Sequence, residues 1–186
     1  MAIITISGNI GSGKTALSTR LAEALGYDEL YMGNVFRELA KEKGMTIEEF
    51  YAALKNDPEI ERAVDRQQAD FMKLNNDIVM QGRMAWFFAK ESTFPAFNVF
   101  LRVDPKIGAE RSGKRKENAG RPLEAIIKAN TAREASERER YKILYDIENV
   151  QDPTHYDFVL DTSKLTEDET FKKVFEKITE RIEADV

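Results

Sequence analysis

Cysteine is absent from this sequence of 186 residues, and histidine occurs only once, at His155. The lack of cysteine excludes disulfides, thiolate metal sites and a cysteine nucleophile. A single histidine excludes a metal site built from several imidazoles. No apolar run approaches the roughly 20 residues that a membrane-spanning helix needs, and the first residues lack the basic and small-residue pattern of a signal peptide. We therefore expect a cytoplasmic protein with no membrane partner.

A large excess of charge of one sign is also missing. The chain has 28 Lys and Arg against 33 Asp and Glu, which gives a net charge of -5. A slightly acidic chain is poorly suited to non-specific nucleic-acid binding, so no nucleic-acid partner is expected. With 42% hydrophobic and 33% charged residues, the composition is that of a folded protein. The length suits a single domain over residues 1–186, which we expect to act as a monomer.

Short, apolar, β-branched segments alternate along the chain with segments of helical periodicity. Strands are expected at 2–7, before Gly33, and at 77–81, 97–103 and 156–161. Helices are expected at 14–25, at 34–43 and on to about 74, after Asp104, over most of 111–146 with a break near 118–122, and at the C-terminus after the capping signal at 166–169. This alternation predicts an α/β fold in which helices cover both faces of a parallel sheet.

The segment GNIGSGKT, residues 8–15, matches the pattern G-x-x-x-x-G-K-[ST] between an expected strand and an expected helix. Glycines let the backbone N–H groups of such a loop point inward, and the helix N-terminus adds partial positive charge. Lys14 can reach the β- and γ-phosphates, and the Thr15 hydroxyl can sit on Mg²⁺. A glycine-rich turn that only caps a helix would not require all eight positions. The predicted nucleoside triphosphate site comprises Gly8, Asn9, Ile10, Gly11, Ser12, Gly13, Lys14 and Thr15.

Two arginines follow expected strands at the edge of the sheet where ligands bind in open α/β folds. Arg37 lies near the start of a helix, and Arg83 follows Gly82 at the end of the strand at 77–81. Either side chain could hold a second phosphate through two hydrogen bonds. The alternatives are a solvated helix arginine for Arg37 and an ordinary strand-ending turn around Arg83.

A third group of arginines lies in the charged stretch from 111 to 141. Arg133, Glu137 and Arg140 are spaced i, i+4, i+7 and share one helix face, whereas Arg111 and Arg115 share another. One interpretation is an exposed helix with internal salt bridges. The other is a lid that closes its arginines over transferring phosphates, where one arginine can be worth about 10³–10⁵ in rate.

Several segments, in the same order along the chain, carry a resemblance to a known family. They read ITISG-x-x-GSGKT, GNVFRELAKEKG, NDPEIERAVDRQQ, a strand ending in GR, RSGKR, RE-x-x-ERERY and YDFVLDTS-x-L. Together they resemble the nucleoside monophosphate kinases, and most closely the short, archaeal-type cytidylate kinases. The resemblance runs almost from end to end of the chain, and the ordered set is more specific than the loop motif alone.

The resemblance implies a P-loop NTPase three-layer fold with a five-stranded parallel sheet in the order 2-3-1-4-5. It implies a monophosphate-binding insert at about 34–75 and a helical lid at about 111–141. The implied reaction is the transfer of a phosphoryl group from ATP to CMP or dCMP, with Mg²⁺ as the metal. Such a reaction needs no protein base, because the acceptor phosphate, with a second pKa of about 6, is already mostly dianionic near neutral pH.

The same resemblance implies roles for individual side chains. Lys14, already assigned to the phosphates by the loop motif, and Arg115 and Arg133, acting from the lid, are the expected catalytic residues. Arg37 and Arg83 are expected to bind the phosphate of the acceptor. Further acceptor-binding residues implied in this way are Asp65, Glu137 and Arg140.

Two departures from the family pattern leave the acceptor open. Gln81 stands where the strand ending in GR usually has an acidic residue, and Leu30, Tyr31 and Met32 replace residues that are more often small. A P-loop kinase for another small acceptor, such as AMP, another nucleotide or a metabolite, is therefore an alternative. A nucleotide-binding switch ATPase is a second alternative, although the arginine-rich lid argues against it.

Overall fold

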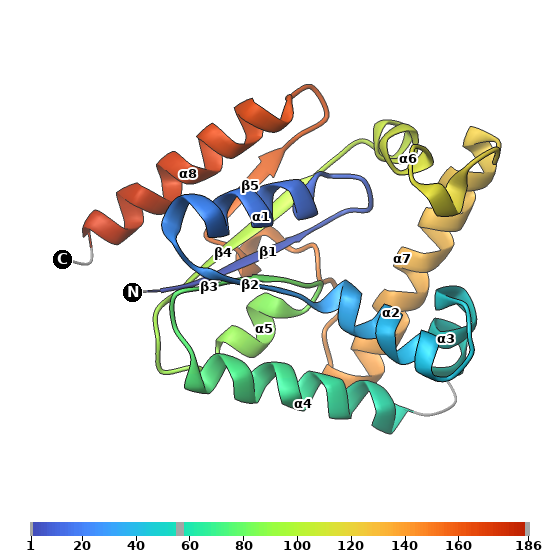
Figure 1. Ribbon diagram of the computed structural model, residues 1–186, viewed down its shortest axis with the longest axis horizontal. Helices are drawn as coiled ribbons and strands as arrows, with labels where there is room; N and C mark the ends of the chain where they lie inside the picture. The colour runs from blue at the N-terminus through green and yellow to red at the C-terminus, as the bar shows by residue number, and fades with distance from the viewer. Residues whose placement is uncertain (1, 55–57, 185–186) are drawn as a thin grey trace.

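A five-stranded parallel sheet forms the centre of the computed structural model, which describes residues 2–54 and 58–184 (Figure 1). The strands are β1 (Ile3–Gly8), β2 (Asp28–Tyr31), β3 (Ile78–Gln81), β4 (Ala96–Arg102) and β5 (Phe158–Asp161). Their order across the sheet is β2-β3-β1-β4-β5, which confirms the predicted order, and every pairing is parallel. All six residues of the central strand β1 are buried, as a strand covered on both faces requires.

Helices cover both faces of this sheet and also extend beyond the end at which its strands terminate (Figure 1). α1 and α8 lie on one face, α4 and α5 lie on the other, and α2, α3, α6 and α7 reach past the carboxyl ends of the strands. Their bounds are α1 (Lys14–Leu25), α2 (Met32–Glu42), α3 (Ile47–Leu54), α4 (Pro58–Leu74), α5 (Ala85–Ala89), α6 (Pro105–Gly113), α7 (Leu123–Tyr145) and α8 (Glu167–Ala184), with short 3-10 turns at Lys116–Asn118 and Pro153–His155.

The two faces of the sheet carry separate hydrophobic clusters, because successive strand residues point to opposite sides. Ile4 packs with residues of α1 and α8, among them Leu21 and Ile178. Its neighbour Ile3 packs on the other face with residues of α4 and α5, including Met72 and Trp86. These clusters anchor the sheet from both sides, so the loops at the carboxyl ends of the strands start from fixed positions.

Local capping signals account for several helix starts. In α3 the Thr46 backbone N–H donates to the Glu49 carboxylate at 2.7 Å, and the Glu49 N–H donates back to the Thr46 hydroxyl at 3.2 Å. The Asp104 carboxylate accepts from the N–H groups of Lys106 and Ile107 at the start of α6. Asp57, the expected cap of α4, lies outside the described residues.

Two differences from the predicted boundaries concern the end of the sheet that faces the site. α2 begins at Met32, two residues before the expected start, because it follows β2 directly without a loop. The charged stretch breaks after Gly113, earlier than the expected break near 118–122, and resumes as a helix at Leu123, with Lys116–Asn118 forming a 3-10 turn between them. Helix α6 packs against α7, and α3 packs against both α2 and α4.

Candidate nucleotide-binding site

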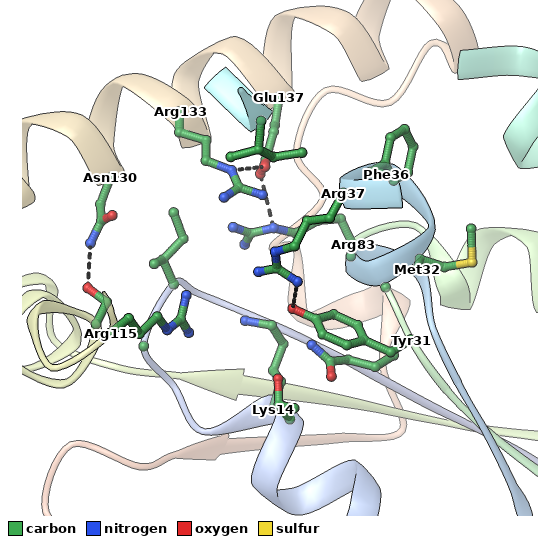
Figure 2. Close-up of a pocket in the computed structure, with 18 of the residues that line it drawn as sticks. Lys14, Tyr31, Met32, Phe36, Arg37, Arg83, Arg115, Asn130, Arg133 and Glu137 are labelled. Carbon is green, nitrogen blue, oxygen red and sulfur yellow. Dashed lines mark hydrogen bonds and ion pairs between the residues drawn. The ribbon is translucent and has the colours of Figure 1, made fainter. Parts of the chain in front are cut away.

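A cavity of about 1350 Å³ opens beyond the carboxyl ends of the strands. Its walls come from the loop before α1, from α2, α3, α4 and α7, and from the segment between α6 and α7. Figure 2 shows charged side chains converging on it from several of these elements. Ligands of open parallel α/β sheets bind at this edge, so the cavity is the candidate site.

The loop at 8–15 packs so closely on its neighbours that two of its glycines cannot carry a side chain. A Cβ on Gly8 would lie 2.3 Å from the Leu101 carbonyl oxygen, and a Cβ on Gly11 would lie 2.1 Å from that of Gly108. Both glycines also have positive φ, at 151° and 79°. The loop is therefore pressed against β4 and the first turn of α6, which holds its curved backbone in place.

Lys14 and Arg83 both donate to carbonyl oxygens of this loop. Lys14 Nζ lies 2.9 Å from the Gly8 oxygen and 2.6 Å from the Asn9 oxygen, and Arg83 Nη1 lies 2.6 Å from the Gly8 oxygen. Burial lowers the pKa of Lys14 well below its usual value, and the positive charges of Arg83 and Arg115 lower it further. Lys14, Arg83 and Arg115 thus form a group of neighbouring positive charges, and such a group attracts phosphate.

The donor set near Thr15 fits a magnesium ion carried by phosphates rather than a metal held by a protein cage. Thr15 is exposed and lines the cavity. Within residues 2–54 and 58–184, no group of three or more His, Cys, Asp or Glu side chains could hold a metal ion. Mg²⁺ commonly keeps its waters and takes few protein ligands beside the phosphates, so a single hydroxyl is compatible with it.

Gln81, the departure at the end of β3, is buried, and its side-chain oxygen lies 3.3 Å from the Ser18 hydroxyl oxygen. The same hydroxyl donates at 2.5 Å to Glu29 on the neighbouring strand β2, and Glu29 also accepts from Thr19 at 3.0 Å. A carboxylate of β2, rather than one of β3, therefore bonds to α1 at this point.

Glu134, which the sequence reading did not single out, bonds to the phosphate loop from α7. Its carboxylate accepts from the Ile10 N–H at 3.2 Å and from the Asn9 amide at 3.4 Å, and it lies 3.8 Å from Arg83 Nη1. A carboxylate on a loop N–H of this kind is one more sign that the loop attracts anions.

Arg37 projects from α2 and is exposed, whereas Tyr31 is half-buried beneath it (Figure 2). Arg37 Nη1 donates to the Tyr31 hydroxyl at 3.1 Å and to Asn34 at 3.2 Å. Burial alone would raise the pKa of Tyr31, but the hydrogen bond and charge of Arg37 lower it. The bulky Tyr31 thus holds Arg37 over the cavity, which gives one physical role to the unusual segment before Gly33.

Glu137 joins two of the predicted arginines. Its carboxylate lies 3.0 Å from Arg83 Nε and 2.9 Å from Arg133 Nε (Figure 2). Burial alone would raise the pKa of Glu137, but the charges of Arg83 and Arg133 hold it below its usual value. Arg133 also donates to the Tyr51 hydroxyl of α3 at 3.1 Å. Glu137 therefore orients the arginines, and a network links α3, α7 and the end of β3.

Arg140 pairs with Glu61 across α7 and α4. Arg140 Nε and Nη2 donate to the two carboxylate oxygens at 2.9 Å and 3.3 Å, and only 6% and 2% of the two side chains are exposed. One turn along α4, the Asp65 carboxylate accepts from the Tyr145 hydroxyl. Burial and the nearby charge of Glu61 raise the pKa of Asp65 to about 7, against the opposing effects of Tyr145 and Arg140.

The two helices present matching polar faces to the cavity. The set on α7 was predicted from its i, i+4, i+7 spacing, and α4 has the same spacing at Glu61, Asp65 and Gln68. Sequence reasoning named only Asp65 on α4, although the spacing itself would have identified all three. Tyr51 carried no comparable signal, because its position against Arg133 depends on how α3 packs.

The two remaining arginines, Arg115 and Arg111, have different partners. Arg115 is exposed and points toward Lys14, whose pKa its charge helps to lower (Figure 2). Arg111 also lines the cavity, and it donates to the carbonyl oxygens of Thr162 and Leu165 at 2.8 Å and 3.2 Å, which ties α6 to the chain after β5.

The structure gathers the predicted site residues around one cavity. Gly8 and Asn9 contribute carbonyl oxygens behind it, and the others line it, namely Ile10, Gly11, Ser12, Gly13, Lys14, Thr15, Arg37, Asp65, Arg83, Arg115, Arg133, Glu137 and Arg140.

Among the helices of the described ranges, none combines the length and the apolar character that crossing a membrane would require.

Several proteins that resemble this chain in sequence or in fold carry the names of kinases. The chain is 38% identical to a cytidylate kinase of Methanopyrus kandleri over 91% of this chain and 89% of that protein. It is 35% identical to a cytidylate kinase of Methanococcus maripaludis over 98% of this chain and 99% of that protein. A shikimate kinase from Bacteroides thetaiotaomicron has the same fold, with a TM-score of 0.64 at 14% identity over 98% of each chain.

The model of the cytidylate kinase-like family matches residues 3–164, which include the phosphate loop, both polar helix faces and all five strands. The fold is that of the P-loop NTPases, and the chain belongs to the cytidylate kinase-like family.

Proposed function

We propose that the protein transfers the γ-phosphoryl group of Mg-ATP to CMP or dCMP. One observation carries the proposal: a single cavity joins a phosphate-binding loop at one end to a compartment lined by arginines and carboxylates at the other. The names of the archaeal relatives support the same acceptor, since they are cytidylate kinases.

The loop end suits the donor. Its backbone N–H groups and the first turn of α1 would hold the β- and γ-phosphates. Lys14, held 2.6 Å from the Asn9 oxygen, would exchange that carbonyl for a phosphate oxygen. Mg²⁺, bound through the phosphates and the Thr15 hydroxyl, would supply charge neutralisation at the transferring group.

The opposite end suits an acceptor that already carries a phosphate. Arg37 and Arg83 both line the cavity between the loop and α4, and their hydrogen bonds and ion pairs fix their direction. Arg133 and Arg115 approach from the segment we assign as the lid. Charge on the phosphoryl oxygens is the main obstacle in phosphoryl transfer, and fixed guanidinium groups address it.

The site needs no general base. The one histidine, His155, is half-buried and stacks on Trp86 with ring centres 3.9 Å apart, in the layer beneath the sheet. The acceptor phosphate, with a second pKa of about 6, is its own nucleophile near neutral pH. Arginine placement and exclusion of water are then the main tasks of the protein.

Two mobile parts follow from this assignment. We assign residues about 34–75 as the monophosphate-binding insert and about 111–141 as the lid of one domain spanning 1–186. Their closure over both nucleotides would exclude water and suppress wasteful ATP hydrolysis. A cytoplasmic location and a monomeric state stay predictions from the sequence.

A coupled assay of ADP release tests the proposal, with CMP, dCMP, UMP, AMP and GMP offered separately and with a reaction that lacks an acceptor. We expect turnover with CMP or dCMP and little without an acceptor. Arg83→Ala should lose this turnover, whereas Arg66→Ala, at an exposed arginine of α4, should keep it. An equal rate of ADP release with and without an acceptor would instead indicate an ATPase. No ADP release with any of the five nucleotides would indicate an acceptor that is not one of them.

A further inference from the structure

Gln68 is an orphaned amide at the α4 end of the cavity. Only 4% of the residue is exposed, and it lines the cavity. Its Nε2 has no hydrogen-bond partner among the residues that the structure describes. Native proteins rarely leave a buried donor unpaired, because the lost hydration is not repaid. A buried, unpaired donor on a residue that lines an open cavity can find its partner in a ligand.

Asp65 lies one helical turn before Gln68 and lines the same end of the cavity. Its Oδ2 accepts from the Tyr145 hydroxyl. A carboxylate has room for several hydrogen bonds, so Asp65 keeps accepting capacity for a ligand. The third member of the face, Glu61, is occupied through both oxygens by Arg140. Asp65 as an acceptor and Gln68 Nε2 as a donor, one helical turn apart, thus remain for recognition of a ligand.

Apolar side chains line the same cavity. Met32 and Met84 are 6% and 4% exposed, Phe36 is half-buried, and all three line the cavity. Figure 2 shows Met32 and Phe36 on the α2 side of the site, beyond Arg37 and Arg83 as seen from Lys14. Apolar walls with a few fixed polar groups are the usual form of a site for a flat, polar-edged ring.

We propose that Asp65 and Gln68 select the base of the acceptor by accepting from an exocyclic amine and donating to the unprotonated ring nitrogen beside it. The inference rests on the proposed function and specifies its acceptor class. Cytosine and adenine present this donor–acceptor edge. Uracil and guanine present the inverse, a carbonyl oxygen beside a ring N–H. A site built on paired buried polar groups rejects a mismatched edge strongly, because both partners are left unpaired.

The choice between cytosine and adenine is then made by size rather than by this pair. Met32, Phe36 and Met84 set the room available, and the larger purine needs more of it.

Gln68→Met is the sharpest test, because methionine keeps the length of the side chain and removes the amide. We expect kcat/KM for CMP to fall about 10- to 100-fold, mostly through KM, with a much smaller change for UMP. Gln67→Met is the matched control, since Gln67 is the exposed neighbour on the same helix, and it should change neither value. The thermal midpoint of Gln68→Met should stay the same or rise, because an unpaired buried donor is removed.

Asp65→Asn, assayed at pH 8 where the Asp65 carboxyl is ionised, tests the other half of the pair, since the amide offers a donor where the carboxylate could only accept. The ratio of kcat/KM for CMP to that for UMP should fall about 10- to 100-fold. If all variants keep the wild-type ratio while phosphorylating CMP, the base-reading inference is wrong and the proposed function stands. A lower thermal midpoint in Gln68→Met, with the ratio unchanged, would show that the amide has a structural partner.

Calorimetry separates a failure of the proposed function from a failure of this inference. If the wild type phosphorylates none of the nucleotides, the proposed function fails, and the binding of CMP, AMP and UMP still reports on the pair. Weaker binding of CMP by Gln68→Met than by Gln67→Met would support the base-reading role. Equal binding by the two variants would overturn it.

Discussion

The two ends of the cavity are built in different ways. At the loop end, one contiguous segment of eight residues supplies backbone N–H groups, and its glycines press against β4 and α6. At the opposite end, the groups that face the ligand are side chains of α4 and α7, joined by buried ion pairs and hydrogen bonds. A backbone cradle recognises phosphate in any nucleotide, whereas side chains on two helices can distinguish one acceptor from another.

The two ends of the cavity also differ in the substitutions that would disrupt them. Backbone groups cannot be deleted by substitution, so the loop end is sensitive to crowding and to loss of its lysine. The α4–α7 end depends on buried ion pairs, and a buried charge without its partner is strongly destabilising. Substitutions at this end should therefore affect stability as well as acceptor binding.

The largest effect is expected from Arg140→Met, which leaves Glu61 buried and unpaired. We expect a loss of about 3–5 kcal/mol in the free energy of unfolding, measured by urea denaturation. The double variant Glu61→Leu with Arg140→Met should recover most of it, because two apolar side chains replace the pair. Arg138→Met, at an exposed arginine of the same helix, is the control and should stay close to the wild type. Equal losses in the single and double variants would contradict this reasoning.

Lys14→Met addresses the loop end. We expect kcat to fall about 10²–10³-fold, since a fixed positive charge is removed from the transferring phosphoryl group. The fall should be the same for every accepted acceptor, because the lysine lies against the loop. Stability should not decrease, since the Lys14 ammonium is held at a cost that its lowered pKa reflects. Unequal losses for CMP and AMP in the coupled assay would show that Lys14 also senses the acceptor.

Asp65→Asn should change how stability depends on pH. The pKa of Asp65 is raised from 3.8 to about 7, so the folded protein holds a proton that the unfolded chain releases between these values. Wild-type stability therefore falls as pH rises from about 4 to 7, by about 2–4 kcal/mol for this group. The variant cannot ionise, so its stability relative to the wild type should increase over this window. Urea denaturation at pH 5 and pH 8 measures the difference.

The control for that measurement is Asp70→Asn, on the exposed side of the same helix. Its difference from the wild type should be nearly the same at both pH values. If Asp65→Asn behaves like Asp70→Asn, the carboxyl of Asp65 is not buried as the structure places it.

The smallest effect is expected from the two matching capping boxes. Thr46→Ala should cost about 1 kcal/mol by loosening the start of α3, which carries Tyr51 against Arg133. Steady-state kinetics should show a severalfold rise in KM for the acceptor and no change for ATP. Thr166→Ala removes the equivalent cap from α8, on the donor side of the cavity, and should leave the acceptor KM alone. The reverse pattern would assign α3 to the donor.

Several features of the fold and the site follow from residues that are close together in the sequence. GNIGSGKT between an apolar strand and a helix predicts the phosphate loop, because its geometry depends on its own glycines and on the helix that follows. The capping boxes at Thr46 and Thr166 are of the same kind. The helix face of Arg133, Glu137 and Arg140 also follows from spacing alone. The order of the sheet came from the resemblance to a family, and the structure confirms it.

The partners of these side chains did not follow from the sequence. Arg140 was expected near the acceptor, and its side chain is bonded to Glu61, 79 residues away. Glu137 holds Arg83 and Arg133 in direction, and Glu134 occupies a loop N–H. The ring of His155 is stacked on Trp86, far away in the sequence. Each of these contacts depends on how one helix or loop packs on another, which no local pattern encodes.

The sequence by itself determined the loop at 8–15 that we propose holds phosphate, because a backbone cradle is made by consecutive residues and their φ and ψ angles. Only the tertiary structure decided which carboxylate neutralises which arginine and which polar groups of the cavity stay unpaired within the described residues. Those outcomes are set by the packing of α4 against α7 over the edge of the sheet. Burial there makes an unpaired charge or polar group strongly destabilising.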